Sequence, residues 1–439
     1  PGVTAQDRLD DTPGLGCAPS GIDRFELGRP SRIYYGSGGG TNIAADAAAK
    51  FGNTLHSFYI QDEIFFDALD LTVVAGFRYE TFTSDDAPVF NQTFTAANGV
   101  PNNANIDGLD LIMPRLGFTW GMRDDLQLRG GIGLYAGGNP NVWLSNAWSN
   151  DGLTNAQFQF NYFDSATVLP GMPDSLPLIG SGRPGYDVPQ EMFDAVAAVS
   201  PTDANDSRIV LIDPDYKQPA QWKFALGASW DMPIWDITAD FDVLHTRAVD
   251  SAYYVDVSQS VVGQTSLGTP IYAYTTGEDN FMLTNSSEDG QSTLLSVILN
   301  KSFDWGLDLS MGYAHTRAKD VSPMTSFVAG SNFSNLALLD INNPFAGISN
   351  YVTPHRFTLR ASYANEFFGD NSTIITAYAT AQEGQPISYV MSAGLEGEDR
   401  NSRHLLYVPT GATDPNVIYD PGFDQAAFNA FVASAGLSP

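Results

Sequence analysis

The chain of 439 residues carries 21 Lys and Arg against 50 Asp and Glu, which gives a formal net charge of −29 at pH 7. This acidic balance excludes nucleic acid as a partner, because proteins that bind nucleic acid present basic patches. Charged residues make up 16% of the chain, against about 25% in soluble domains. No run approaches the roughly 18 apolar residues of a membrane-spanning helix. Any passage through a bilayer must therefore use a closed barrel of strands.

Residues 1–53 form a polar, glycine-rich lead-in, with a short helix predicted over 44–50. Cys17 is the only cysteine, so no disulfide can form within the chain. The chain begins abruptly at Pro1 without a signal peptide, which indicates a mature fragment of a longer product.

The strands follow in hairpins from residue 56 onward. In residues 305–317, Trp305, Leu309 and Tyr313 point to one face, while small or polar residues such as Ser310 point to the other. Aromatic residues near both ends of an apolar face are typical of a membrane-spanning strand of about 9–11 residues. The same pattern predicts ten strands in five hairpins: 56–66 with 71–82, 114–122 with 126–135, 222–230 with 235–247, 293–303 with 305–317, and 355–363 with 372–381.

The face opposite the apolar residues carries charge. Three carboxylates alternate with apolar residues in 235–247, and this arrangement requires a wet lumen rather than a dry core. Inward arginines are interpreted as ion-pair partners of these acids, and contact with an anionic ligand is the alternative. The predicted lumen-facing residues are Arg78, Arg129, Asp236, Asp240, Asp242, Arg356 and Arg360.

The connections alternate between a few residues and tens of residues. This is the asymmetry of a bacterial outer-membrane barrel with short periplasmic turns and long extracellular loops. The long loops are 83–112, 137–217, 248–291 and 318–354. The predicted fold is all-β, an antiparallel transmembrane β-barrel spanning 1–439. It comprises a lead-in (1–53), barrel hairpins with long loops (54–382) and an extracellular loop segment with a short helix around Phe428 (383–439).

The loop 137–217 is the longest, with a helix predicted over 190–199. Long loops in an economical fold usually carry function, so we expect this one to close over the barrel mouth. Its aromatic residues lie among amides and hydroxyls, which suits a sugar or a peptide; packing of the loop against its neighbours is the alternative. The candidate substrate-loop residues are Trp143, Trp148, Phe158 and Tyr162.

Catalytic and metal motifs are missing from the sequence. The five histidines lack a metal-ligand spacing and no GxSxG elbow occurs, so no catalytic, metal or cofactor-binding residue is predicted and the chain is not interpreted as an enzyme. A surface hydrolase using His245 and His315 is an open alternative. A divalent cation at acidic loop residues is another, although neither cluster has the ligand spacing of a calcium loop. These clusters are Asp213 with Asp215, and Glu396 with Glu398 and Asp399.

The segment 58–63 (FYIQDE) followed by 71–80 (LTVVAGFRYE) resembles the hairpin of TonB-dependent outer-membrane receptors. The wider set is similar to the Oar-like branch of that family. It includes 23–26 (DRFE), 30–36 (PSRIYYG), 114–118 (PRLGF), 138–143 (GNPNVW), 355–357 (HRF) and 407–411 (YVPTG). The resemblance implies a 22-stranded barrel in a Gram-negative outer membrane, with an N-terminal plug and a TonB box. Neither the plug nor the TonB box is found in these residues.

The leading functional hypothesis is a receptor that takes up a large solute, such as a peptide, glycan or metal chelate, with energy from TonB. The alternatives are a passive porin-like channel and a non-transport surface barrel, an adhesin or hydrolase. The implied partners are outer-membrane lipid and lipopolysaccharide, TonB through a plug outside this chain, and an unidentified solute or surface protein.

Overall fold

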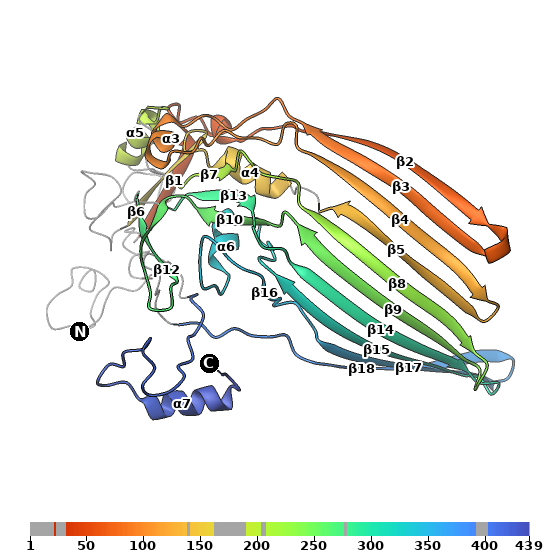
Figure 1. Cartoon of the computed structure of the whole chain (residues 1–439). Coiled ribbons are helices and arrows are strands. Elements are labelled where there is room, and N and C mark those ends of the chain that lie inside the picture. Colours follow the sequence, from red (N-terminus) through yellow and green to blue (C-terminus); the bar gives the residue numbers. More distant parts are fainter. Residues whose placement is uncertain are drawn as a thin grey trace.

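The computed structural model describes residues 22, 32–137, 141–161, 190–202, 208–275, 279–391 and 403–438. Its main element is one long, curved antiparallel sheet (Figure 1). Ten strands follow one another in the order β18-β17-β15-β14-β9-β8-β5-β4-β3-β2, and the short β16 (Gly347–Ile348) pairs with β15. The ten are β2 Thr54–Phe66, β3 Leu71–Thr83, β4 Asp110–Arg123, β5 Leu126–Ala136, β8 Ala220–Met232, β9 Ile237–Val249, β14 Gln291–Ser302, β15 Leu307–Asp320, β17 His355–Phe368 and β18 Asn371–Gln382.

These are the ten strands that the alternation predicted, and each forms the expected hairpin with its neighbour. The expectation that Asp236 belongs to a strand is wrong. Trp235 and Asp236 both have positive φ, 68° and 47°, in the turn between β8 and β9. A tight turn needs such left-handed residues, and Asp tolerates that conformation better than most. Asp236 therefore does not share the strand face of Asp240.

One face of the sheet is an exposed apolar band. The register puts Phe241 opposite both Ala228 and Val297, and Met311 opposite both Leu299 and Leu359. These side chains remain open to the surroundings: Met311 is 55% exposed. A continuous band of this kind on a sheet whose other face is polar fits contact with lipid hydrocarbon. Further exposed members of the band are Phe77, Leu116, Phe224, Leu226, Val243, Leu295 and Phe357.

Cysteine labelling checks which face meets lipid. In a Cys17→Ser background, we expect Leu309→Cys and Phe241→Cys to react with lipid-soluble probes, because both positions belong to the apolar band. Ser310→Cys and Asp240→Cys belong to the opposite face and should react with aqueous reagents alone. Labelling in the reverse sense would contradict the assignment of the two faces.

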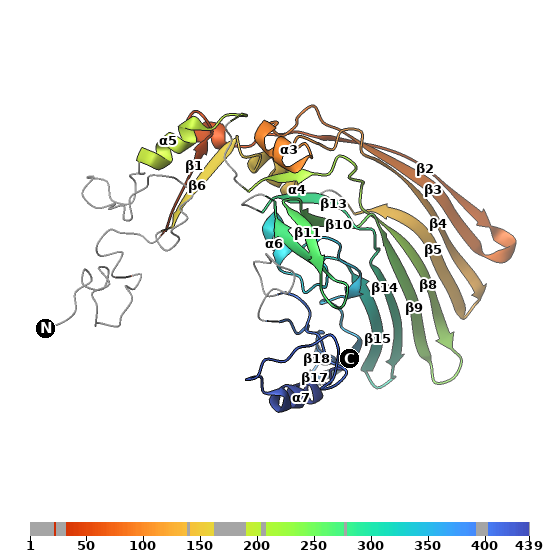
Figure 2. The same ribbon diagram turned by 60° about the vertical axis from the view of Figure 1, so that its left-hand side comes forward.

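The long connections gather at one end of the sheet, opposite the short turns (Figures 1 and 2). They contain further short strands and helices, and the positions and pairing of these strands were not predicted from the sequence. Three strands, β10-β13-β7, form a small sheet in which β7 and β13 run parallel. The loop-end strands are β1 Arg32–Gly38, β6 Asn155–Asn161, β7 Val210–Ile212, β10 Ala252–Asp256, β11 Gln259–Gln264, β12 Pro270–Tyr274 and β13 Phe281–Asn285.

Short helices complete the structure. The helices expected over 190–199 and near the end of the chain are confirmed as α5 Gln190–Ala198 and α7 Gln425–Ser434. The one expected over 44–50 is a single 3-10 turn, η1 Ala44–Ala47. The others are η2 Asp67–Leu69, α3 Gln92–Asn98, α4 Asn141–Ser149 and α6 Ala329–Ser334. None of the helices in the described residues is long and apolar enough to cross a membrane.

A hydrophobic core joins the loops. Side chains from four connections pack together at the end of the sheet, and we call this assembly the loop cluster. Because the core contains residues that are far apart in sequence, the loops form one packed unit and do not fold separately. Its buried residues are Phe82, Ile106, Leu144, Ala147, Trp148, Val210, Ile212, Tyr216, Ala252, Tyr254, Tyr272, Phe281, Leu283, Met324, Ala329, Phe333 and Ile341.

Candidate functional site

The polar face of the sheet holds a charged network across three strands. Arg129 on β5 donates from Nη2 to Oδ1 of Asp242 on β9 at 2.7 Å, and from Nη1 to Oγ of Ser229 on β8 at 2.7 Å. Ser229 Oγ donates in turn to Oδ1 of Asp240 at 2.6 Å. Gly227 lies between Arg129 and Asp242 in the register, and a Cβ there would lie 2.5 Å from the Asp242 carboxylate. A glycine is thus required for the ion pair to span β8.

A second cationic group lies two rows along the same face, and it was not among the predicted lumen-facing residues. Arg115 Cζ lies 4.5 Å and Lys223 Nζ lies 5.3 Å from the centre of the Tyr135 ring. Such cation–π contacts are attractive by about 0.5–2 kcal/mol. Arg115 alternates with the apolar Leu116, so strand alternation would have identified it. Together the two groups border a hollow of about 860 Å³, whose lining includes Arg115, Arg129, Tyr135, Lys223 and Asp242.

The other expected arginines lie on this face too. Arg78 pairs with Glu80 at 2.5 Å and donates to Ser57 Oγ at 2.9 Å. Arg356 lies opposite Ala314 and Arg360 lies opposite Ser310 in the register, and both arginines are exposed. The wall therefore carries several cations in a chain that is strongly acidic overall.

The candidate substrate-loop aromatics have different surroundings. Trp148 and Phe158 are buried, 4% and 5% exposed, so their rings pack inside the loops, which was the alternative interpretation for them. Trp143 is half-buried against the loop cluster, and its Nε1 donates to the carbonyl of Ser326 at 3.1 Å. Tyr162 lies outside the described residues.

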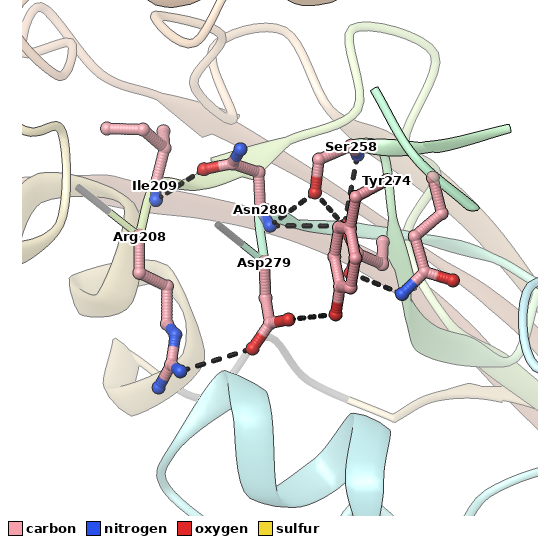
Figure 3. Close-up of polar contacts among 8 residues, drawn as sticks. Arg208, Ile209, Ser258, Tyr274, Asp279 and Asn280 are labelled. Carbon is pink, nitrogen blue, oxygen red and sulfur yellow. Dashed lines mark hydrogen bonds and ion pairs between the residues drawn. The ribbon is translucent and has the colours of Figure 1, made fainter. Parts of the chain in front are cut away.

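A buried polar network holds the small loop sheet together (Figure 3). Arg208 Nη2 contacts Asp279 Oδ2 at 3.1 Å, and the Tyr274 hydroxyl donates to the other Asp279 oxygen. Beside them, Asp256 accepts from the backbone N–H and the hydroxyl of Ser258 and from the N–H of Asn280. Burial is the largest influence on Asp256 and raises the pKa of its carboxyl, while these hydrogen bonds oppose that rise.

The acidic clusters and histidines give no assembled centre in the described part of the chain. No group of three or more His, Cys, Asp or Glu there could hold a metal ion. Asp213 accepts from Asp215 N at 2.9 Å and from Thr284 Oγ1 at 2.5 Å. His245 contacts Thr293 Oγ1, and His315 contacts the Pro354 carbonyl, both at 2.9 Å. Cys17, Glu396, Glu398 and Asp399 lie outside the described residues.

Comparison with known proteins identifies the class. A family model described as an outer membrane beta barrel domain matches residues 4–436, so the chain belongs to this family. The protein is accordingly an outer-membrane β-barrel protein of a Gram-negative bacterium. No curated protein in the comparison matches the sequence.

Several solved structures are similar over part of their length. The FrpB iron transporter from Neisseria meningitidis (F3-3 variant) is 11% identical, with 76% of this chain and 35% of that chain covered and a TM-score of 0.37. The siderophore receptor PirA from Pseudomonas aeruginosa is 12% identical, with 76% and 50% covered and a TM-score of 0.31. The ferric-catecholate import receptor Fiu from E. coli K12 is 13% identical, with 74% and 44% covered and a TM-score of 0.26. The chain thus spans half or less of the length of these structures.

Proposed function

We propose that this chain forms part of the barrel of a TonB-dependent receptor of the Oar-like branch, which takes up a large solute such as a peptide, glycan or metal chelate. The observation that carries the proposal is a packed loop cluster at one end of a barrel wall whose inner face is charged and hollowed. Simple pores need an open mouth, whereas a receptor needs a folded surface that can select a solute. The hairpin at 58–80, which contains the sequence Gln61-Asp62-Glu63, supports assignment to the same family.

In this proposal the loop end faces the outside and the turn end faces the periplasm, as the alternation of long and short connections favours. The face that carries Arg78, Arg129, Asp240, Asp242, Arg356 and Arg360 lines the lumen. The Arg129–Asp242 pair fixes neighbouring strands, and the loop 137–217 contributes to solute capture. TonB would act through a plug and TonB box outside this chain.

TonB dependence tests the proposal. Cells that carry or lack the full-length protein, with and without TonB, are supplied with radiolabelled peptides, glycans and chelated iron. We expect uptake of one of these classes to fall to background when either the protein or TonB is removed, because active import needs both. Matched cells expressing the protein with Trp235→Ala, an exposed turn residue, serve as the control and should retain uptake. Uptake that needs the protein but not TonB would instead establish a passive channel.

A further inference from the structure

Three cations lie together on the lipid-facing side of the sheet at the loop end. Arg247 on β9 and Lys319 on β15 are both opposite Gln291 of the intervening β14. Strands are about 4.8 Å apart, so these two backbones lie within about 10 Å of each other. Arg317 is two residues from Lys319 on the same face, opposite Thr293. Alternation from the exposed Met311 along β15 assigns Arg317 and Lys319 to the face of the apolar band, and alternation from Phe241 along β9 assigns Arg247 to the same face. We call these residues the rim cations.

The rim cations are accessible and incompletely neutralised. The Arg247 side chain is 64% exposed and pairs with Asp289 at 3.2 Å. Arg317 and Lys319 are also exposed, and no carboxylate in the described residues lies within ion-pair distance of either. Only 21 Lys and Arg occur in the chain against 50 acids. Within the described residues, two cations without an ion-pair partner beside a lipid-facing band are therefore a local excess of positive charge.

Below the rim cations lies a row of rings. Tyr313 packs on Phe357 with ring centres 4.7 Å apart, and His315 stacks on His355 at 4.6 Å. Leu295 and Val243 are level with His315 in the register. The apolar band continues beneath the rings with Met311, Leu299 and Leu359. Aromatic rows of this kind mark the boundary between hydrocarbon and head groups. Arg317 and Lys319 are thus at head-group level, two and four residues beyond His315 along β15, and Arg247 is level with Lys319.

A hollow adjoins this position. It measures about 460 Å³ and lies over the loop ends of β14 and β15, where its lining includes Arg317, Lys319, Ile348, Val352 and Pro354. Ile348 is 68% exposed, so the hollow combines two cations with apolar walls. This combination suits an amphiphile that bears an anionic group on a bulky head, rather than a small, fully hydrated anion.

We propose that the rim cations and the adjoining hollow bind a phosphate group on the head of lipopolysaccharide in the outer leaflet, with its acyl chains lying along the apolar band. The inference rests on the orientation in the proposed function, in which the loop end is external. Lipopolysaccharide is favoured over a zwitterionic phospholipid because Arg317 and Lys319 supply positive charge that no acid in the described part of the chain pairs with. Arginine and lysine both bind phosphate well.

Binding of purified lipopolysaccharide to the full-length protein in detergent tests this site. The probe is a rough lipopolysaccharide with intact lipid A phosphates, followed by native mass spectrometry. For Arg317→Gln/Lys319→Gln we expect affinity to fall roughly thirtyfold, from about fivefold for each cation near an anionic lipid surface. Lys301→Gln is the matched control, because Lys301 lies on the same face of β14 at the turn end, and it should leave binding unchanged.

Three results would overturn the proposal: equal binding by the double variant, equal binding of chemically dephosphorylated lipopolysaccharide, or equal binding of phosphatidylethanolamine. Orientation is checked separately. Phe327, which is 70% exposed in the loop 321–354, is replaced by cysteine in a Cys17→Ser background and treated with an impermeant maleimide on intact cells. If Phe327→Cys is labelled and the double variant still binds lipopolysaccharide normally, the lipid site alone is rejected. An absence of labelling would reject both the lipid site and the proposed orientation.

Discussion

Replacement of Trp148 by alanine is expected to unfold the loop cluster while the barrel strands remain assembled. Trp148 is 4% exposed and stacks on Phe51 with ring centres 4.5 Å apart. Its Nε1 has no hydrogen-bond partner among the described residues, so its contribution is packing. Truncation of a buried aromatic residue costs about 3–5 kcal/mol. This cost applies to the loop cluster, because the strands are held by their own hydrogen-bonded ladders.

The measurement combines limited proteolysis of the loops with the heat-modified mobility of the barrel on gels. We expect chymotrypsin to cut the loops of Trp148→Ala rapidly and the barrel to keep its folded mobility. Trp235→Ala is the control, because this tryptophan is 74% exposed in a turn and its loss removes little packing. Loops that resist protease as in the unchanged protein would contradict the assignment of Trp148 to the core.

The second large effect is expected at Asp256, where alanine and asparagine should differ sharply. The carboxylate is 2% exposed and accepts four hydrogen bonds, from Ser258 N at 3.0 Å, Ser258 Oγ at 2.5 Å, Asn280 N at 3.1 Å and Gln259 Nε2 at 2.9 Å. Each buried donor left without a partner costs about 1–3 kcal/mol. Asp256→Ala should therefore destabilise the loop cluster by at least about 3 kcal/mol.

Asp256→Asn should be tolerated. The amide oxygen retains the bonds from Ser258 and Asn280, and rotation of the Gln259 amide turns its Oε1, which has no partner among the described residues, toward the new donor. Burial raises the pKa of the Asp256 carboxyl, so the folded state binds the proton more tightly than the unfolded state does. Stability from this group is therefore present at low pH and lost as the pH rises through its folded pKa.

Thermal unfolding of the loop cluster from acid to neutral pH checks this sign. Because asparagine stays neutral, Asp256→Asn should be at least as stable as the unchanged protein at pH 7. That difference should shrink below the ordinary carboxyl pKa of 3.8. If Asp256→Asn proves as unstable as Asp256→Ala at pH 7, the burial of charge is not what governs this position.

The barrel strands could be predicted because each carries its own signal. In β15, for example, the two-residue alternation depends on neighbouring residues alone. The same alternation in β5 and β9 assigned Arg129 and Asp242 to one face, where they form an ion pair. Asp236 was assigned wrongly because it lies in the turn before β9, where the left-handed backbone interrupts the alternation. Alternation could have assigned Arg115 to this face, but it could not reveal that Arg115 and Lys223 share a contact with Tyr135, which belongs to a third strand.

The loop cluster could not be predicted because its contacts are not local. Trp143 Nε1 bonds the carbonyl of Ser326, and β7 pairs in parallel with β13, about seventy residues away. No periodic pattern encodes such pairings. The exposure of an aromatic residue in a loop depends on these distant partners, so the sequence left open whether Trp148 and Phe158 would pack or meet a solute.

The distant pairings in the loop cluster also impose an order of assembly. Asn146 donates to the carbonyl of Phe327, 181 residues further along the chain. Strands β8, β9, β14 and β15 lie between these two loops in the sequence. Forming the contact before the strands have aligned would therefore cost a large loop-closure entropy. The strands therefore act as the template on which the loops condense, and the surface at the loop end is the last part of the molecule to mature.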